Sequence, residues 1–387
     1  MKQAQTYQPA RHWLDSWHVD PSANRTYDFI DGLRGVAILM VLACHLIYAH
    51  EPNSPAGRFL LHFSNSMGKG VNLFFTLSGF LIAWPFWKRK VNQSTQLVPP
   101  GYGWRRFWKI YPPLALSILV LTPLFIWSEG DAPVFIRTAI EWLTGVAFLM
   151  PVSGKLNPVM WSLVVEIHFY LVLPMLFLLT RRLSAKTCLW AISAFLFVVP
   201  VSIQAITGKY PVLYPEIKDP FCTGLSCFCF GVAVAGIDAL KLWNKGWSKI
   251  AVAGWPVMVI GLAGWTWAGL EPAQNAAIIL HLSHWIFLLG TGCLLCYAAN
   301  PDHVHARWLC APWLRWCGVI SYEWYLFHQP IIYWARTLFG PAQGNVAKYL
   351  LIIGLPVLVS VTFSALVYRL FSLPILKFGR QTRVAAK

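Results

Sequence analysis

Arg34 and His45 have the residue types and the spacing that most directly suggest chemistry. The ten residues between them are almost entirely apolar, so both ionisable groups belong to a hydrophobic segment. Eleven helical steps of about 100° return to within roughly 20° of the starting direction. In a helix, both side chains therefore lie on one face, about 16 Å apart along the axis. Ionisable residues in such segments are candidates for function.

Glu166 and His328 place two more ionisable side chains at a depth similar to that of His45, in two other apolar segments. Isolated polar residues would scatter in depth, so a shared level indicates one water-accessible cavity. A carboxylate beside an imidazole fixes its tautomer and raises its basicity, which suits a general base. We therefore expect His45 and Glu166 to be catalytic. The alternatives are a buried histidine satisfied by a backbone carbonyl and a glutamate that neutralises a buried cation.

Two stripes of polar side chains accompany these residues at helical spacing. One follows i, i+4 and i+8 through Glu166, and the other follows i, i+4 and i+7 to His328. We expect both stripes to face the cavity and to bind substrate, although for His328 a structural role competes with this interpretation. His168 points about 200° away from Glu166 on the same helix and should pack elsewhere. The predicted substrate-binding residues are Trp161, Ser162, Tyr170, Tyr325 and His328.

A basic group gathers where apolar segments meet their inner edge, and it consists of Arg34, Arg105, Arg106 and Lys109. The planar fork of Arg matches phosphate oxygens, so this basic group is suited to hold a polyanionic cofactor. The alternative is that these side chains set the orientation of the chain or bind anionic lipid. Arg34 differs from the others because it faces the same side as His45.

Membrane-spanning helices must position these residues. The chain of 387 residues is 57% hydrophobic and 12% charged, with 21 Trp, and a soluble domain cannot hide that much apolar surface. We expect an all-α integral membrane bundle of about ten transmembrane helices, with a short interfacial or partly buried helix at 134–150 in an external loop. The predicted spans are 33–50, 70–87, 110–127, 159–180, 188–207, 221–240, 250–269, 276–298, 316–338 and 349–376.

The net charge of +16 is distributed unevenly between the two sides of the membrane. With the N-terminus inside, the cytoplasmic segments hold most of the Lys and Arg, which predicts that both termini are cytoplasmic. The chain then divides into a cytoplasmic segment 1–32, a transmembrane domain 33–376 and a basic cytoplasmic tail 377–387. We expect a multi-pass protein of the cytoplasmic (inner) or plasma membrane that contacts membrane lipids. We expect no nucleic-acid binding, because no basic groove with interleaved aromatic residues is separable from these loops.

The nine cysteines and the N-terminal segment indicate no disulfide framework, no metal site and no cleavable signal peptide. Most cysteines fall in or at the ends of apolar spans, where a free thiol behaves as a small hydrophobe. Cys293 and Cys296 have redox-motif spacing but no second pair. Trp13 and Trp17 are spaced to form a short helix on the inner leaflet, with a disordered tail as the alternative.

Five sequence blocks, in order along the chain, resemble blocks of the integral-membrane acyltransferase 3 family. The first is Asp31-Gly-Leu-Arg34-Gly, followed by nine residues and His45. The others are Val71 to Ile82 around Ser78, Arg105 to Pro112, Trp161 to Tyr170, and Ser321 to Pro330. The similarity extends over residues 28–375, close to the whole predicted membrane part.

The resemblance implies transfer of an acyl group, usually acetyl, from cytoplasmic acyl-CoA to a hydroxyl of a cell-surface or lipid-linked carbohydrate. It maps the family's Arg–His signature onto Arg34 and His45. Lys109 departs from the family's pattern, where a second Arg is frequent, so coenzyme contact there would be weaker or differently shaped. Many members carry a fused extracytoplasmic esterase-like domain. This chain ends at Lys387 without one, so we expect direct transfer or a separate extracytoplasmic transferase as a partner.

The combined expectation is one continuous tunnel, in which coenzyme phosphates rest on the basic group at the inner mouth and the thioester reaches His45. His45, oriented by Glu166, removes the proton from an acceptor hydroxyl that enters from outside. An acyl-histidine intermediate is the less economical variant. Because intramembrane histidines at similar depth also suit other proteins, the alternatives are a proton-coupled transporter and a b-type haem protein. Candidate oxyanion donors are Ser162, Tyr325 and Trp161.

Overall fold

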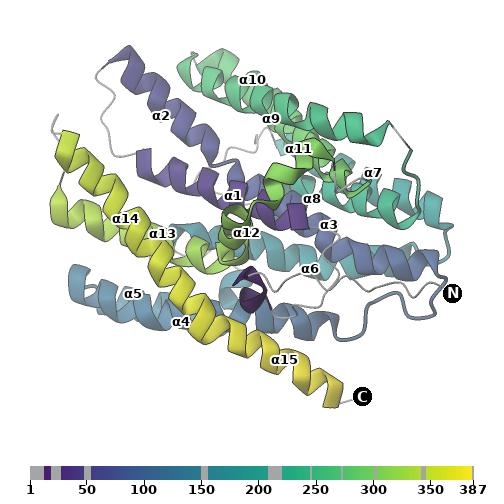
Figure 1. Ribbon diagram of the computed structural model, residues 1–387, viewed down its shortest axis with the longest axis horizontal. Helices are drawn as coiled ribbons and strands as arrows, with labels where there is room; N and C mark the ends of the chain where they lie inside the picture. The colour runs from purple at the N-terminus through teal and green to yellow at the C-terminus, as the bar shows by residue number, and fades with distance from the viewer. Residues whose placement is uncertain are drawn as a thin grey trace, which may run out of the picture.

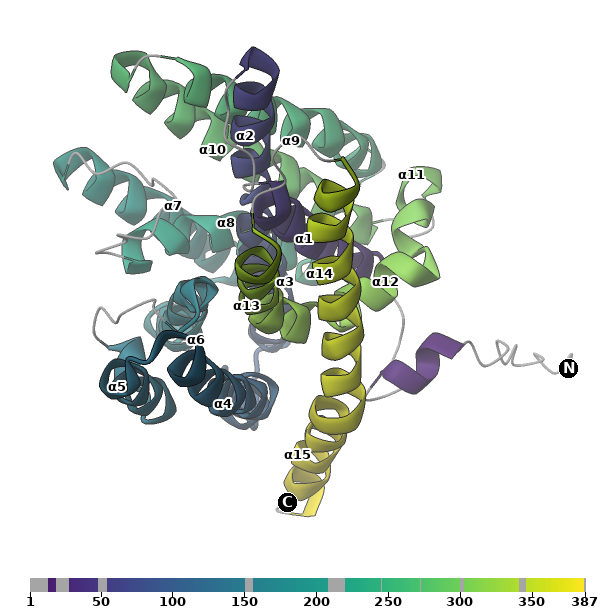
Figure 2. The same cartoon turned by 90° about the vertical axis from the view of Figure 1, so that its left-hand side faces the viewer.

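The computed structural model of the protein describes residues 13–18, 28–47, 54–149, 156–207, 220–244, 246–271, 273–299, 303–340 and 346–385. Within these ranges the regular structure is helical, as the sequence predicts. The long helices run side by side in Figure 1, and Figure 2 shows several of them nearly end on, such as Tyr102–Glu129 and Ser321–Phe339, while Val346–Val367 and Leu373–Ala385 cross the view. The expected all-α class is therefore confirmed.

The helices follow one another along the chain with short connections. The longer ones are α1 (Asp28–Ile47), α2 (Pro55–Met67), α3 (Gly70–Val91), α4 (Tyr102–Glu129), α5 (Ala132–Leu143), α6 (Trp161–Leu179), α7 (Ala185–Thr207), α8 (Pro220–Ala239), α9 (Trp247–Leu270), α10 (Ala273–Leu295), α12 (Pro312–Val319), α13 (Ser321–Phe339), α14 (Val346–Val367) and α15 (Leu373–Ala385). Shorter elements include η1 (Trp13–Trp17), α11 (Val304–Arg307) and the π-helical turn η6 (Tyr368–Ser372), which joins α14 to α15.

Eight of the described segments are long and apolar enough to cross a membrane, which identifies a multi-pass integral membrane protein. They are Asp28–Leu46, Pro55–Val91, Tyr102–Glu129, Pro158–Leu179, Ala185–Ser202, Lys249–Leu270, Ile278–Ala298 and Leu350–Gln381. Two predicted spans differ. The span 221–240 contains a shorter described apolar helix, Gly224–Ala239, and the span 316–338 is interrupted at Ile320 between α12 and α13. The count of ten and the cytoplasmic termini remain predictions.

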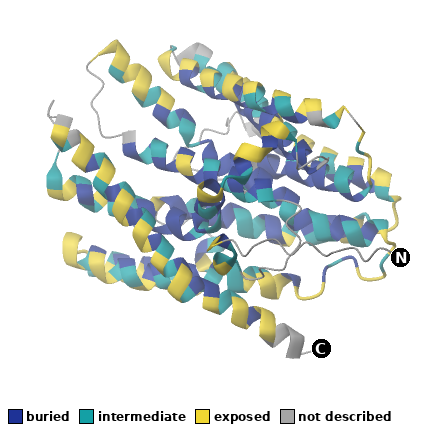
Figure 3. Cartoon of the chain, in the orientation of Figure 1, coloured by how far each residue is buried: buried dark blue, intermediate teal, exposed yellow. Residues whose placement is uncertain are grey.

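Helix α3 lies at the centre of the bundle. It packs against α1, α6, α8 and α10, and its Phe80, Phe86 and Trp87 are fully buried. Exposed positions concentrate on the outer helices, as Figure 3 shows. Many of these outer side chains are large and apolar, with Trp127 87% exposed and Leu179 78% exposed, which suits contact with lipid chains.

Close backbone contact fixes the start of α1 against α12. A Cβ atom on Gly318 would lie 1.8 Å from the Asp31 carbonyl oxygen, so only glycine fits there. Small residues allow this kind of approach between membrane helices. The contact matters because Asp31 precedes Arg34 by one helical turn, and Gly318 precedes the first turn of α13. The contact thus fixes α1 relative to α13, the two helices whose side chains Arg34 and Ser321 meet.

Two helices occupy the segments predicted to be external. α5 overlaps the predicted partly buried segment 134–150, lies against α4 and buries Phe135 and Trp142, which confirms a partly buried helix there. α2, in contrast, was missed, because no helix was predicted between the spans 33–50 and 70–87. α2 begins after Ser54, whose side chain accepts a hydrogen bond from the Gly57 N–H, and it packs against α1 and α9. Its buried residues are Ser64 and Ser66, whereas Phe59, Leu60 and Phe63 are exposed, so no buried apolar stripe marked this helix in the sequence.

Both ends of the chain pack against the bundle where they are described. In η1, the Trp17 ring stacks on Tyr368 with centroids 6.1 Å apart and meets Trp316 edge-on, so this short helix docks on protein. At the other end, α15 continues the helix into the predicted tail 377–387. Trp104 of α4 donates a hydrogen bond to the Gly379 carbonyl at 3.0 Å. The tail is therefore helical as far as Ala385, and it contacts α4 at Gly379. The predicted N-terminal segment lies mostly outside the described residues.

Candidate active site

A cavity of about 70 Å³ lies between α1, α3, α4, α6 and α13, large enough for several water molecules. The first turns of α6 and α13 both contribute to its wall, so the positive ends of two helix dipoles lie beside it. Most of the wall surface is apolar, although charged, hydroxyl and tyrosine side chains contribute about half of the lining residues. Its lining residues are Arg34, Val71, Phe74, Phe75, Leu77, Ser78, Leu81, Lys109, Ile110, Ser162, Leu163, Glu166, Ser321, Tyr322 and Tyr325.

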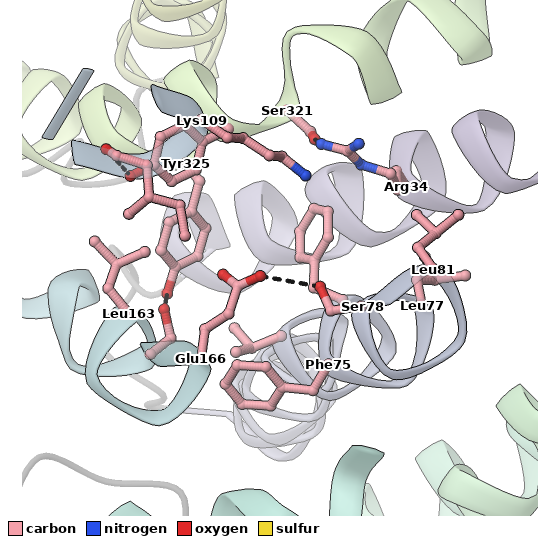
Figure 4. A pocket seen from close by; sticks show the side chains of 15 residues that line it. Arg34, Phe75, Leu77, Ser78, Leu81, Lys109, Leu163, Glu166, Ser321 and Tyr325 are labelled. Atoms are coloured by element: carbon pink, nitrogen blue, oxygen red, sulfur yellow. Dashed lines mark hydrogen bonds between the residues drawn. The ribbon is translucent and has the colours of Figure 1, made fainter. Parts of the chain in front are cut away.

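Two cations and one carboxylate face this cavity. Arg34 Nη2 donates a hydrogen bond to Ser321 Oγ at 3.0 Å, and Ser321 Oγ donates to the Gly318 carbonyl at 2.8 Å. In Figure 4, the Lys109 ammonium and the Glu166 carboxylate extend into the cavity from opposite walls, with Arg34 beside Lys109. A mostly apolar wall strengthens the field of these charges. The cavity is therefore suited to hold an anionic or strongly polar group.

Glu166 is held by two hydroxyl groups. Its Oε1 accepts hydrogen bonds from Ser78 Oγ at 3.1 Å and from the Tyr170 hydroxyl at 2.5 Å. Tyr102 of α4 donates to the Tyr170 carbonyl at 3.1 Å and so ties α4 to the same position of α6. The i, i+4 spacing of Glu166 and Tyr170 thus produces the predicted shared face. Ser78, a polar residue in an apolar segment, was not selected as a site residue.

The predicted basic group separates into three environments. Lys109 lines the cavity together with Arg34. Arg106 lies over the rings of Tyr102 and Tyr170, at 5.9 and 5.4 Å from their centroids. Arg105 is exposed and donates to the Pro100 carbonyl at 2.8 Å. One turn of helix therefore carries a lining cation, a cation over aromatic rings and a surface cation.

His45 pairs with His328 and not with Glu166. His328 Nε2 lies 3.1 Å from His45 Nδ1, and the ring centroids are 4.9 Å apart. The expectation that Glu166 orients His45 is wrong, because its carboxylate accepts from Ser78 and Tyr170 instead. The prediction that Arg34 and His45 share a face is confirmed, since both contact α13, at Ser321 and at His328.

Tyr325 contacts both the cavity and the histidine pair. Its ring lines the cavity and lies 5.8 Å from the His328 ring. Its hydroxyl accepts from Ser162 Oγ at 2.9 Å and donates to the Val159 carbonyl at 2.8 Å. His45 is not among the lining residues of this cavity. The continuous tunnel from Arg34 to His45 stays a prediction, and Tyr325 is the residue that contacts both the cavity and His328.

The other predicted site residues lie close to this centre. Trp161 contacts the cavity through Phe75, whose ring it meets edge-on at 6.3 Å. His168 Nε2 hydrogen-bonds to the Phe148 carbonyl at 2.7 Å, which confirms that it packs elsewhere. Arg336 was missed. It donates to the carbonyls of His45 and Leu46, and only its position two turns beyond His328 on α13 would have pointed to it.

A second polar cluster lies away from this site, around Lys69. Lys69 is 1% exposed, and its Nζ lies 3.1 Å from His284 Nδ1 and 3.4 Å above the Trp265 ring. Asn72 Nδ2 also approaches His284 Nδ1, at 3.3 Å. Within the described ranges, no group of three or more His, Cys, Asp or Glu side chains is arranged to hold a metal ion.

Comparison with known proteins adds a family to this geometry. The profile of an acyltransferase domain family, acyltransferase 3, matches residues 27–365. O-acetyltransferase OatA of Staphylococcus aureus is 26% identical over 377 residues, which cover 90% of this chain and 57% of the relative. Peptidoglycan O-acetyltransferase OatA of Listeria monocytogenes is 24% identical over 385 residues, with 90% and 56% covered. Acyltransferase MdmB of Streptomyces mycarofaciens is 28% identical over 190 residues, with 47% of each chain covered.

The chain spans about half the length of these curated relatives. No solved structure matches it. The family match covers the helices that build the cavity and the histidine pair, from the start of α1 almost to the end of α14. On the extent of that match, the chain belongs to the acyltransferase 3 family.

Proposed function

We propose that the protein is a membrane O-acyltransferase. It moves an acyl group, most simply acetyl, from cytoplasmic acyl-CoA to a hydroxyl of a cell-surface or lipid-linked carbohydrate. The observation that carries this proposal is the placement of two cations in an apolar cavity on the same side of α1 as a histidine pair about three helical turns away. Helix α1 thus carries both a cation that can bind an anionic donor and a histidine that can act as the general base.

The cavity is the coenzyme end of the site. Arg34 and Lys109 supply positive charge inside the bundle, and the first turns of α6 and α13 add their dipoles. Arg forks and Lys ammonium groups both bind phosphate oxygens. Arg105 is exposed next to this end and is placed to attract a polyanion toward it. The thin pantetheine arm is the part of the coenzyme that suits the narrow cavity.

The chemical step takes place at His45. Its imidazole removes the proton from the acceptor hydroxyl, whose oxygen then attacks the thioester carbonyl carbon. The carbon–sulfur bond breaks, the ester remains on the acceptor, and the leaving thiolate takes the proton back from the imidazolium. General-base help of this kind is typically worth about 10²–10⁴-fold. Tyr325 touches both the cavity and His328, so its side chain is the one that would turn aside for the thioester to meet His45.

The nature of the acceptor is proposed from two relatives. One carries peptidoglycan O-acetyltransferase in its name, and another carries O-acetyltransferase. A carbohydrate hydroxyl of the cell surface is therefore the acceptor class we assign to this chain. Transfer is either direct or through a separate extracytoplasmic transferase, and the reaction as written requires no metal.

The experiment is mass spectrometry of surface glycans and lipid-linked precursors from cells that produce the full chain, the His45→Ala variant or neither. We expect an acyl mass increment with the wild-type chain and its loss with His45→Ala. His168→Ala is the matched control, because this histidine bonds to a backbone carbonyl away from the cavity. Correct insertion of each variant is checked by its abundance in isolated membranes. A full acyl increment with His45→Ala would disprove the role of His45 as base.

A further inference from the structure

His328 has a single neutral tautomer that fits its surroundings. Its Nδ1 lies 3.0 Å from the Trp324 carbonyl and 2.8 Å from the Tyr325 carbonyl, and a carbonyl oxygen only accepts hydrogen bonds. Nδ1 must therefore carry the hydrogen. In the neutral ring, Nε2 then holds a lone pair and acts as an acceptor. His328 is fully buried, so this arrangement is shielded from water.

The tautomer of His45 follows from that of His328. His45 Nδ1 lies 2.9 Å from the Val41 carbonyl and 3.1 Å from His328 Nε2, and both of these atoms are acceptors. Nδ1 of His45 must therefore be protonated, with its hydrogen shared between the two. The Nε2 atom of neutral His45 then carries the lone pair, and no residue in the described part of the chain hydrogen-bonds to it. Nε2 is left available to take a proton.

We propose that His328 is the positioning residue of His45: it accepts the Nδ1 hydrogen, directs the Nε2 lone pair toward the acceptor and stabilises the imidazolium that forms. This inference rests on the proposed acyl transfer, in which His45 Nε2 receives the hydroxyl proton. After that transfer, the Nδ1–H bond to His328 becomes charge-assisted and stronger. An aligned neutral imidazole thus takes the place that a carboxylate holds in many catalytic triads.

Helix α13 holds His45 in a second way. Arg336, two helical turns beyond His328, donates to the carbonyls of His45 and Leu46 near the end of α1. Those carbonyls lie in the last turn of α1, where partners within the helix are lacking. The ring of His45 is therefore fixed through His328 and its backbone through Arg336. A rigid base needs both restraints, because a rotation of the His45 ring or a shift of its backbone would move the Nε2 lone pair.

The kinetic test compares His328→Met with His328→Gln. Methionine fills the space without an acceptor of similar strength, whereas the Gln side-chain oxygen lies near the position of Nε2 and can accept the His45 hydrogen. Incorporation of label from radioactive acetyl-CoA is measured in membrane vesicles that contain the full chain and its native acceptors. We expect His328→Met to lower the maximal rate about 10- to 100-fold with an unchanged KM for acetyl-CoA, the loss of one hydrogen bond to a charged group.

His328→Gln should recover most of the rate, and His168→Met, the matched control, should leave it unchanged. A wild-type rate in His328→Met would overturn the proposal, as would a Gln variant no better than the Met variant. A change in the KM for acetyl-CoA with an unchanged maximal rate would assign His328 to coenzyme binding and overturn it as well.

A second measurement separates this proposal from the reaction itself. Solid-state NMR of the full chain in lipid, labelled with ¹⁵N-histidine, distinguishes Nδ1–H from Nε2–H rings whether or not the protein is active. The His45 and His328 signals are identified by their absence in the His45→Ala and His328→Gln variants. We expect both rings to carry hydrogen on Nδ1. An Nε2–H ring at His45 overturns the assignment, and an Nδ1–H ring in a protein without transferase activity would refute the proposed function alone.

Discussion

Replacement of Arg34 gives the sharpest test of the coenzyme end of the site. Its guanidinium lines the cavity beside Lys109 and donates to Ser321 Oγ at 3.0 Å. Ser321 Oγ also donates to the Gly318 carbonyl at 2.8 Å, so Ser321 stays satisfied when the guanidinium turns toward a ligand. Binding a phosphate to Arg34 therefore leaves the Ser321 hydroxyl with a hydrogen-bond partner. A hydrogen bond to a charged group is worth about 1.5–3 kcal/mol, so Arg34→Met should raise the Kd for coenzyme A about 10- to 100-fold.

The assay is calorimetric titration of the full chain in detergent with two ligands, coenzyme A and pantetheine. Pantetheine keeps the thiol arm but has no phosphate. Arg34→Met should therefore weaken coenzyme A binding and leave pantetheine binding unchanged. Arg34→Lys should fall between the wild type and Met, because Lys keeps the charge without the fork. Arg137→Met is the matched control, since this Arg side chain is 82% exposed in a pair with Glu141.

Two results would refute this reasoning. An unchanged Kd for coenzyme A in Arg34→Met would show that Arg34 does not contact a phosphate group. An equal loss of affinity for both ligands would show that Arg34 shapes the cavity through its bond to Ser321 and binds no phosphate. Ser321→Ala separates these cases further, because it breaks that bond and keeps the guanidinium. It should leave the Kd for coenzyme A close to the wild-type value.

Two further predictions concern the packing around Arg34. Gly318→Ala places a methyl group 1.8 Å from the Asp31 carbonyl oxygen. This overpacking should cost about 1–3 kcal/mol and lower the thermal unfolding midpoint of the protein in detergent. Gly354→Ala is the control and should leave the midpoint unchanged, because the added methyl group meets no atom within 4 Å. A hydrogen bond to Asp31 raises the pKa of His18, which lies outside the membrane-spanning segments. Docking of η1 should therefore be strongest below pH 6.5 and weaken as the pH rises through the raised pKa, which limited proteolysis near Trp17 would detect. His18→Gln should abolish that pH dependence, and a pH-dependent cleavage that persists in this variant would contradict the assignment.

The face shared by Arg34 and His45 was predictable because both residues lie on one helix. Within a single helix, sequence separation fixes both rotation and rise. The same argument holds for Ser321, Tyr325 and His328, whose side chains contact Arg34, Ser162 and His45 in turn. Periodicity thus gave the faces of α1 and α13 correctly. The arrangement of one helix relative to another is not contained in that information.

The position of Glu166 shows where prediction from sequence ends. Its depth along the chain matched that of His45, but depth is one coordinate, and the rotation of α6 about its own axis is another. Tyr102 and Ser78, on two other helices, fix that rotation through hydrogen bonds to Tyr170 and Glu166. No pattern within α6 records these contacts. α2 was missed for a related reason, since its buried Ser64 is held by hydrogen bonds to the carbonyls of Ala43 and Cys44 on α1, and no pattern within α2 records that contact.

The separation of Glu166 from His45 suggests a division of labour within the proposed reaction. Glu166, Lys109 and Arg34 line one cavity, whose apolar wall strengthens the interactions of their charges, so an anionic ligand would bind beside the two cations. His45 and His328 do not line that cavity. A neutral base benefits from distance to Arg34 and Lys109, because Arg336 already lies beside His45 and further cations would oppose the positive charge that the base must acquire. In the proposed reaction, movement of Tyr325, which contacts both the cavity and His328, would bring the thioester to the base.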